Sequence, residues 1–186
     1  SRRIALIAAE AARSAMAAHD INREAAAEAA DVASFAARLG LSHDTLRWRG
    51  WDGRGNLQDA ARRARRRLLA AWAGERGLAA ILIAHTADDQ AETFLLRLAR
   101  GSGVDGLSAM REARQEAGLL WLRPLLGVRR EALREVLSRQ GIRWAEDPSN
   151  TDPRYDRVRM RQALPAFGAL GLTVERLADT AARLGE

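Results

Sequence analysis

The feature that most constrains this fold is a run of seven apolar residues from Leu78 to Ala84, preceded by Gly77. A short apolar run without polar alternation is typical of a strand that is covered on both faces, as in a parallel sheet. The polar turn from His85 to Glu92 follows, and apolar residues then recur at helical spacing from Ala91 to Ala99. This order of strand, turn and helix predicts a central strand of an α/β sheet.

Similar patterns recur along the rest of the chain. We expect further strands at 3–9, 43–48, 119–122 and 142–144, and helices at 25–39, 57–72, 128–140, 157–164 and 173–184. The helix at 157–164 should stop at Pro165, because proline has no N–H to donate. The predicted fold class is α/β, with a doubly wound, mainly parallel sheet, helices on both faces and a small helical C-terminal extension. Residues 1–145 should form the main domain, and 146–186 a loop and helical extension.

Composition excludes several kinds of chemistry. The chain has no cysteine, so disulfides, thiolate metal sites and a cysteine nucleophile are excluded. All thirty basic residues are arginine, which excludes a Walker lysine and a Schiff-base lysine. The net charge of +6 fits a polyanionic partner, although solvated helix faces explain it equally well. With no long apolar run and no secretion leader, we expect a soluble cytoplasmic protein that has no membrane partner.

The acidic turn lies where open α/β sheets bind ligands, beyond the carboxyl end of a strand. Asp88, Asp89 and Glu92 carry hard oxygen ligands of the kind that hold Mg²⁺ beside nucleotide phosphates. Asp89 and Glu92 are three residues apart and hence share one helical face. A structural role is the alternative, with Thr86 or Asp88 capping the helix and Glu92 supporting it. Without further motifs, this capping role is the better interpretation.

Two other segments contain candidate phosphate ligands. The backbone of Gly101 to Gly103 can approach a phosphate closely, although glycines at a helix end are more often a simple C-cap. Arg62 and Arg65 flank the apolar stripe of the helix that begins after Asn56, and they can turn toward the sheet edge or remain in solvent.

Taken together, the motifs resemble those of the bacterial tRNA(Ile)-lysidine synthetases, which belong to the PP-loop ATP pyrophosphatase group. The match is strongest over Ala84–Thr93, with the sequence AHTADDQAET, and it continues through Arg100-Gly101-Ser102-Gly103. The other matching segments are His19-Asp20 with Arg23, Ala25 and Glu28; Asn56-Leu57-Gln58 with Ala61, Arg62 and Arg65; Arg123-Pro124-Leu125-Leu126; and Asp147-Pro148-Ser149-Asn150 with Tyr155, Arg157, Arg161 and Pro165.

The resemblance implies a PP-loop domain of the adenine nucleotide alpha hydrolase type at 1–145. It also implies a ligase that adenylates the wobble cytidine (position 34) of a CAU-anticodon tRNA(Ile) and then joins free L-lysine to its C2, which forms lysidine. ATP and Mg²⁺ are the expected cofactors, and a homodimer is one expected assembly. By resemblance, the catalytic residues are Asp89, Glu92 and Arg157, with Asp89 and Glu92 also holding the metal. The remaining roles are nucleotide binding by Arg62, Arg65, His85, Asp88, Arg100, Gly101 and Gly103, and RNA binding by Arg154, Arg159 and Arg161.

One departure from the family pattern leaves two interpretations open. The family's ATP loop, Ser-Gly-Gly-x-Asp-Ser, is missing after the first predicted strand, which runs directly into Glu10-Ala11-Ala12-Arg13. Either the sequence between Ala8 and Ala18 lacks a stretch that the gene encodes, or the chain is a catalytically inactive homologue. Such a homologue would be a basic module that binds RNA or a protein partner. We favour the first interpretation, because the rest of the site is retained.

Overall fold

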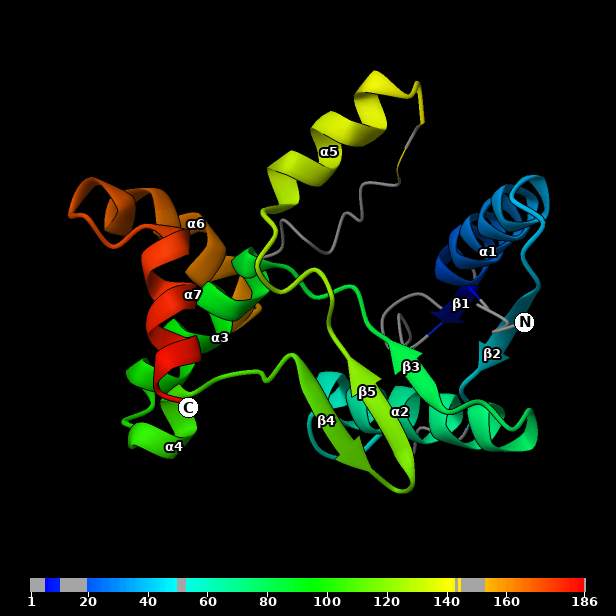
Figure 1. The fold of residues 1–186 in the computed structure, drawn as a ribbon, viewed down its shortest axis with the longest axis horizontal. Coiled ribbons are helices and arrows are strands. Elements are labelled where there is room, and N and C mark those ends of the chain that lie inside the picture. Colours follow the sequence, from blue (N-terminus) through cyan, green and yellow to red (C-terminus); the bar gives the residue numbers. More distant parts are fainter. Residues whose placement is uncertain (1–5, 11–19, 50–52, 143, 145–152, 186) are drawn as a thin grey trace. The chain divides into compact units, whose positions relative to one another are not determined.

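The computed structural model describes residues 6–10, 20–49, 53–142, 144 and 153–185, with only the backbone described at 6–10, 20–25, 28 and 58. The chain divides after Ala79 into two compact units (Figure 1). Within the described part of the chain, no helix is long and apolar enough to cross a membrane.

The first unit is built on a pair of parallel strands. Strand β1 (Leu6–Glu10) pairs with β2 (His43–Arg47), in a register that runs from Leu6 opposite His43 to Glu10 opposite Arg47. Helix α1 (Asp20–Arg38) lies between them in the chain and contacts both strands. It begins earlier than the predicted residue 25, and Gly40 follows it with a φ of 67°, which favours glycine after a helix end.

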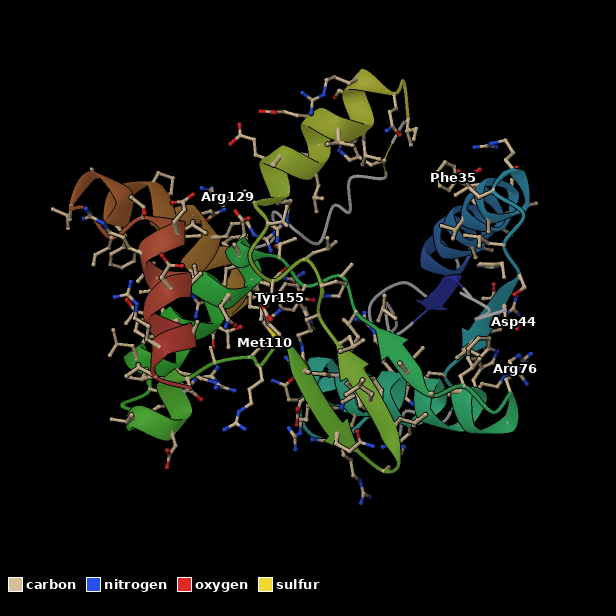
Figure 2. All side chains as sticks on the ribbon, in the orientation of Figure 1. Phe35, Asp44, Arg76, Met110, Arg129 and Tyr155 are labelled. Atoms are coloured by element: carbon tan, nitrogen blue, oxygen red, sulfur yellow. The ribbon has the colours of Figure 1, made fainter. Side chains whose placement is uncertain are left out.

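Helix α2 (Leu57–Glu75) begins as predicted, at Asn56, whose side chain accepts a hydrogen bond from the Asp59 N–H. Its last turns are bound to β2 through Asp44, which accepts hydrogen bonds from Trp72 Nε1 at 3.0 Å and Arg76 Nη2 at 2.8 Å (Figure 2). The Arg76 guanidinium also lies over the Trp72 ring, 4.5 Å from its centre. These contacts bind the sheet pair and α2 into one unit.

The second unit contains a mixed sheet in the order β3-β5-β4. Strand β3 (Ala80–Leu82) is parallel to β5 (Leu119–Leu122), while β4 (Ala113–Glu116) is antiparallel to β5. A two-residue turn joins β4 to β5, with a φ of 51° at Ala117 and 77° at Gly118, as hairpins of this length require. Parallel pairing is therefore confirmed for β1–β2 and β3–β5, whereas the antiparallel edge strand β4 was not predicted.

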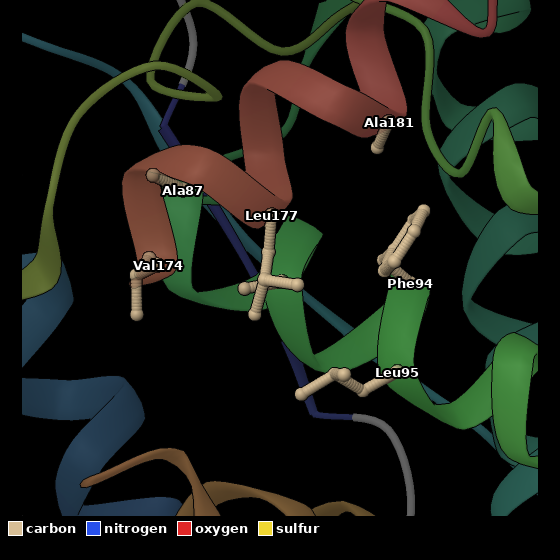
Figure 3. Packing of buried hydrophobic residues seen from close by; sticks show 7 residues of the cluster. Ala87, Phe94, Leu95, Val174, Leu177 and Ala181 are labelled. Carbon is tan, nitrogen blue, oxygen red and sulfur yellow. The ribbon is translucent and has the colours of Figure 1, made fainter. Parts of the chain in front are cut away.

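The helices of the second unit pack on α3 (Ala87–Ala99). Helix α7 (Val174–Arg183) lies against it, and α6 (Asp156–Ala169) contacts it as well. The core between α3 and α7 includes Phe94, Leu95 and Leu177, whose side chains are shown in Figure 3. The remaining helices are α4 (Val104–Leu107) and α5 (Arg130–Arg139). Burial of this apolar surface is what holds 153–185 against the rest of the unit.

Three predictions about individual elements differ from the structure. Helix α6 continues past Pro165 to Ala169, so the predicted stop is wrong; proline removes one hydrogen bond, and the helix ends within the next turn. Ile142 and Trp144 lie outside any strand, and Arg143 is outside the described residues. Strand β3 has Ile81 buried but Leu82 60 % exposed, so its two faces are not covered equally. The loop residues 145–152 and His19 also lie outside the described residues, and the division at 145/146 stays a prediction.

Candidate functional site

The start of α3 is fixed by local hydrogen bonds. Thr86 is the N-cap, and Asp89 completes a capping box: Asp89 Oδ2 accepts from the Thr86 N–H at 2.8 Å and from the Thr86 hydroxyl at 2.7 Å. The Ala87 N–H donates to the Val128 carbonyl at 2.9 Å. Asp88 Oδ2 accepts from the Arg130 backbone N–H at 2.7 Å, which joins the start of α3 to the start of α5. Thr86 is thus the N-cap, one of the two caps that the capping alternative allowed, and Asp89 rather than Glu92 supports it.

Asp89 is held in its charged form by its surroundings. Burial alone raises the pKa of Asp89, but the hydrogen bonds from Thr86 and the charge of Arg130 outweigh burial, so this pKa lies below its ordinary value. Arg130 Nη2 lies 3.1 Å from Asp89 Oδ1, and the aspartate side chain is only 15 % exposed. The carboxylate therefore stabilises the folded state while it is ionised.

This shift predicts how Asp89 contributes to stability as pH changes. Because the pKa of Asp89 is lower in the folded state, its contribution is complete above the unfolded-state pKa of about 4 and is lost as pH falls through the folded-state pKa. Asp89→Asn should lower the free energy of unfolding at pH 7 by about 1.5 kcal/mol. Urea unfolding of both proteins from pH 7 to pH 3 should show this difference shrinking below about pH 4. A difference independent of pH would contradict the assignment.

Glu92 is the most deeply buried acidic residue of the site, with a side-chain exposure of 0 %. Its Oε1 accepts from Arg161 Nε at 2.7 Å, and its Oε2 accepts from Arg161 Nη2 at 3.3 Å. Arg130 Nη1 lies 3.8 Å from the same Oε1. The hydrogen bond to Glu92 raises the pKa of Arg161 above its ordinary value. Glu92 therefore orients two guanidinium groups from α5 and α6 at one point on α3.

The ion pairs extend from α3 to α7. Arg129 Nε lies 3.5 Å from Asp88 Oδ1, and Arg129 Nη1 also pairs with Glu175 on α7 (Figure 2 labels Arg129). The starts of α3, α5 and α7 therefore share one network of carboxylates and guanidiniums.

The predicted basic residues of the later motifs lie on or near α6. Arg157 Nη2 donates to Thr93 Oγ1 at 3.3 Å, which places it beside α3. Arg100 Nη2 pairs with Asp156 at 3.1 Å, and Arg159 pairs with the same carboxylate. Arg154 and Arg159 are exposed. Arg100, Arg157 and Arg161 are thus joined to one surface of α3 and α6.

The remaining predicted residues occupy separate positions. Gly101 follows the C-cap of α3 with a φ of 70°, and Gly103 is the N-cap of α4. Both serve as helix-end residues in this arrangement. Arg62 and Arg65 lie on α2 in the first unit and are exposed. The structure therefore gathers His85, Asp88, Asp89, Glu92, Arg157 and Arg161 in the second unit.

Three arginines of this site were not assigned a role from the sequence. Arg129 and Arg130 bind the acidic residues from the start of α5, a segment interpreted only as a patterned helix. Arg123 belongs to a matched motif, and its side chain donates to His85. The motif match was the available signal for Arg123, whereas nothing in the helical pattern distinguished Arg129 and Arg130.

The carboxylates do not fit a metal ion in this arrangement. The oxygens of Asp89 and Glu92 accept from Thr86, Arg130 and Arg161, and Asp88 is bound by Arg129 and the Arg130 N–H. Among the described residues, no group of three or more histidine, aspartate or glutamate side chains is placed to hold a metal. The arginines fit phosphate oxygens better, since a guanidinium pairs with them in a bidentate manner. The predicted metal role of Asp89 and Glu92 stays a prediction.

Comparison with known proteins agrees with these motifs. The chain is 54 % identical over 166 residues to the tRNA(Ile)-lysidine synthase of Ruegeria pomeroyi, with 89 % of this chain and 40 % of that protein covered. It is 48 % identical to the enzyme of the same name in Methylobacterium nodulans, with 89 % and 49 % covered. The chain thus spans about half the length of the curated relatives it matches. The predicted resemblance is confirmed.

A solved structure supports the predicted fold class. The U34-tRNA thiolase NcsA from Methanococcus maripaludis, described with its [4Fe-4S] cluster, superposes with a TM-score of 0.69 over 86 % of this chain and 56 % of that chain. Sequence identity is only 13 %, so the likeness shows the fold alone. A family model described as a PP-loop domain matches residues 5–166, which confirms the predicted α/β fold class and supports the predicted use of ATP. The chain therefore belongs to the PP-loop domain family.

Proposed function

We propose that this chain is the nucleotide-binding part of a tRNA(Ile)-lysidine synthase. The observation that carries the proposal is the 54 % identity over 166 residues to a protein of that name. The proposed reaction has two steps at the wobble cytidine of a CAU-anticodon tRNA(Ile). Cytidine O2 first attacks the α-phosphorus of ATP and displaces pyrophosphate. The ε-amine of free L-lysine then attacks C2, AMP leaves with the O2 oxygen, and the amine loses a proton.

The arginines that are bound to α3 support this chemistry. Both steps build negative charge on phosphate oxygens, and guanidiniums held in fixed positions stabilise such charge without rearranging. Glu92 holds Arg161 through two hydrogen bonds, and Thr93 accepts from Arg157.

We assign catalytic roles to Asp89, Glu92 and Arg157. Nucleotide contacts are assigned to Arg62, Arg65, His85, Asp88, Arg100, Gly101 and Gly103.

RNA binding is assigned to Arg154, Arg159 and Arg161. A wobble base is reached in a single-stranded loop, where basic side chains contact phosphates while the base enters a pocket. Arg154 and Arg159 are exposed beside the start of α6, whereas Arg161 is half-buried against Glu92. We therefore expect Arg154 and Arg159 to contribute to RNA affinity, and Arg161 to contribute nearer the reacting groups.

Several finer points belong to the same proposal. Mg²⁺ is proposed as the partner of the ATP phosphates, because phosphate oxygens and water supply most of its ligands when it binds together with a nucleotide. A homodimer and a cytoplasmic location, where tRNA is modified, complete the proposal.

Pyrophosphate release by the full-length protein tests the proposed function. With ATP, Mg²⁺ and a CAU-anticodon tRNA(Ile) transcript, we expect release that depends on the tRNA, and AMP release that requires lysine. Asp89→Asn should slow pyrophosphate release at least tenfold, since it changes a charge at the site. The matched control is Asp105→Asn, an exposed carboxylate on α4, which should retain the wild-type rate. An unaffected Asp89→Asn rate would contradict the site assignment.

The alternative of an inactive RNA-binding or partner-binding homologue is not favoured by the matches to lysidine synthases. It predicts that the full-length protein binds no ATP. Calorimetric titration with ATP and Mg²⁺ distinguishes the two: absence of nucleotide binding would overturn the enzyme proposal and leave the alternative.

A further inference from the structure

Arg123 and His85 meet at one edge of the sheet. His85 follows β3 and Arg123 follows β5, and these neighbouring strands are parallel, with Leu82 opposite Leu122. The ladder continues one residue further, since the Ile83 N–H donates to the Leu122 carbonyl at 2.8 Å. The carboxyl ends of parallel strands form the edge where open α/β sheets bind ligands. Both side chains therefore start from the ligand-binding edge.

The Arg123 side chain is buried and firmly held. The residue is 7 % exposed, and its backbone N–H donates to the Glu112 carbonyl at 2.8 Å. Its Nη1 donates to the Arg111 carbonyl at 2.7 Å, and its Nε donates to His85 Nδ1 at 3.3 Å. The guanidinium is thus anchored on the backbone that leads into β4 while it contacts the imidazole. The contact with the Arg111 carbonyl therefore fixes the orientation in which the Arg123 guanidinium donates to His85 Nδ1.

The Arg123 contact determines the protonation of His85. A guanidinium has only N–H donors and stays charged, so Nδ1 accepts through its lone pair. The imidazole is then neutral, and its proton is on Nε2. A protonated imidazole would instead place two positive charges and two opposed donors 3.3 Å apart. Asp89 on α3 also interacts electrostatically with His85, and its negative charge favours the protonated imidazole, whereas the Arg123 guanidinium disfavours it.

We propose that Arg123 is a positioning residue that holds His85 as the neutral Nε2–H tautomer, which donates a hydrogen bond to a phosphate oxygen of the bound nucleotide. The identity of this ligand rests on the proposed function, whereas the tautomer rests on the Arg123 contact. A fixed neutral donor suits an anionic oxygen because it needs no proton uptake before binding. In this proposal Arg123 acts through His85, to which its Nε donates.

Nuclear magnetic resonance of the full-length protein with ¹⁵N-labelled histidine and arginine tests the tautomer directly. At neutral pH we expect His85 to show an unprotonated Nδ1 and a protonated Nε2, with scalar coupling between Arg123 Nε and His85 Nδ1 across the hydrogen bond. The signal is assigned by its loss in His85→Gln. A protonated Nδ1 would overturn the proposal. Because this measurement uses the wild-type protein, it does not depend on whether any Arg123 variant folds.

Two variants separate positioning from simple structural support. Arg123→Met removes every donor and should weaken ATP binding about tenfold, with little change in kcat. Arg123→Lys keeps one donor and should recover most of this affinity, while Arg111→Gln is the control because only its backbone carbonyl is used. If Arg123→Met fails to fold, near-wild-type ATP affinity in Arg123→Lys still supports the positioning role. Wild-type ATP affinity in a folded Arg123→Met protein would overturn the phosphate role.

ATP titration of the labelled protein separates this inference from the proposed function. ATP should shift the His85 Nε2 resonance, and an unchanged resonance on ATP binding would overturn the phosphate contact. If the wild-type protein binds no ATP, the proposed function and this ligand both fail. The coupling to Arg123 still decides whether Arg123 holds the tautomer.

Discussion

Glu92→Ala is expected to lower the free energy of unfolding by about 3 kcal/mol, near the lower end of the cost of breaking a buried ion pair. Glu92 is fully buried, and its removal leaves Arg161 and Arg130 facing one another without their shared carboxylate. The loss is not larger because the two arginine side chains are 31 % and 30 % exposed and keep partial access to water.

Urea unfolding at pH 7 measures this loss. The matched control is Glu175→Ala, which removes an exposed carboxylate from the same network and should cost less than about 1 kcal/mol. Replacing Glu92 and Arg161 together by methionine should cost less than Glu92→Ala, because no buried charge is left unpaired at Arg161. If Glu92→Ala were as stable as Glu175→Ala, Glu92 would not organise the arginines.

Phe94→Ala is expected to lower the free energy of unfolding by about 3–5 kcal/mol, as large truncations in a packed core do. Phe94 is 7 % exposed and belongs to the cluster that joins α3 to α7, together with Leu177 and Ala181 (Figure 3). Truncation removes apolar contact and leaves a cavity between the two helices. Detachment of α7 should therefore accompany the loss.

Hydrogen exchange and urea unfolding together check this prediction. Amide protection should fall in α7 more than in α2, because α7 packs on the truncated residue. Leu98→Ala is the control on the same helix: Leu98 is 51 % exposed, and its truncation should cost less than about 1 kcal/mol. Equal losses for Phe94→Ala and Leu98→Ala would show that the core between α3 and α7 does not stabilise the fold.

The starts of α2, α3 and α7 were predictable from the sequence to within a few residues, because the signals of their N-caps are local. Asn56, Thr86 and Thr173 each accept a hydrogen bond from the backbone N–H three residues later, as N-caps do. The strand before Thr86 was predictable from its apolar run, although the structure shortens it to Ala80–Leu82 and leaves Leu82 exposed.

Elements that depend on pairing partners were not predictable. Strand β4 has the polar sequence ARQE, without the alternation that identifies a strand, and it forms because β5 offers an edge to pair with. Its turn, Ala117-Gly118, lacks the asparagine or aspartate typical of two-residue hairpins. The continuation of α6 past Pro165 likewise reflects packing against α3 rather than local propensity.

The sequence predicted where the acidic residues of the candidate site lie in the fold, but not which side chains they contact. The position of Asp88, Asp89 and Glu92 after a strand followed from the order of the elements. Asp89 pairs with Arg130, which is 41 residues away in the chain, and Glu92 pairs with Arg161, which is 69 residues away. No sequence spacing encodes such contacts, so carboxylates that fitted a metal site in the sequence are bound by arginines in the structure.

Transfer of labelled lysine to tRNA tests the central claim most directly. The full-length protein is incubated with labelled L-lysine and a CAU-anticodon tRNA(Ile) transcript, with and without ATP, beside the Ruegeria pomeroyi enzyme as positive control. We predict label in the tRNA only when ATP is present, and none in a transcript whose wobble cytidine is replaced by uridine. Absence of label under conditions in which the control enzyme modifies the same transcript would contradict the proposed function.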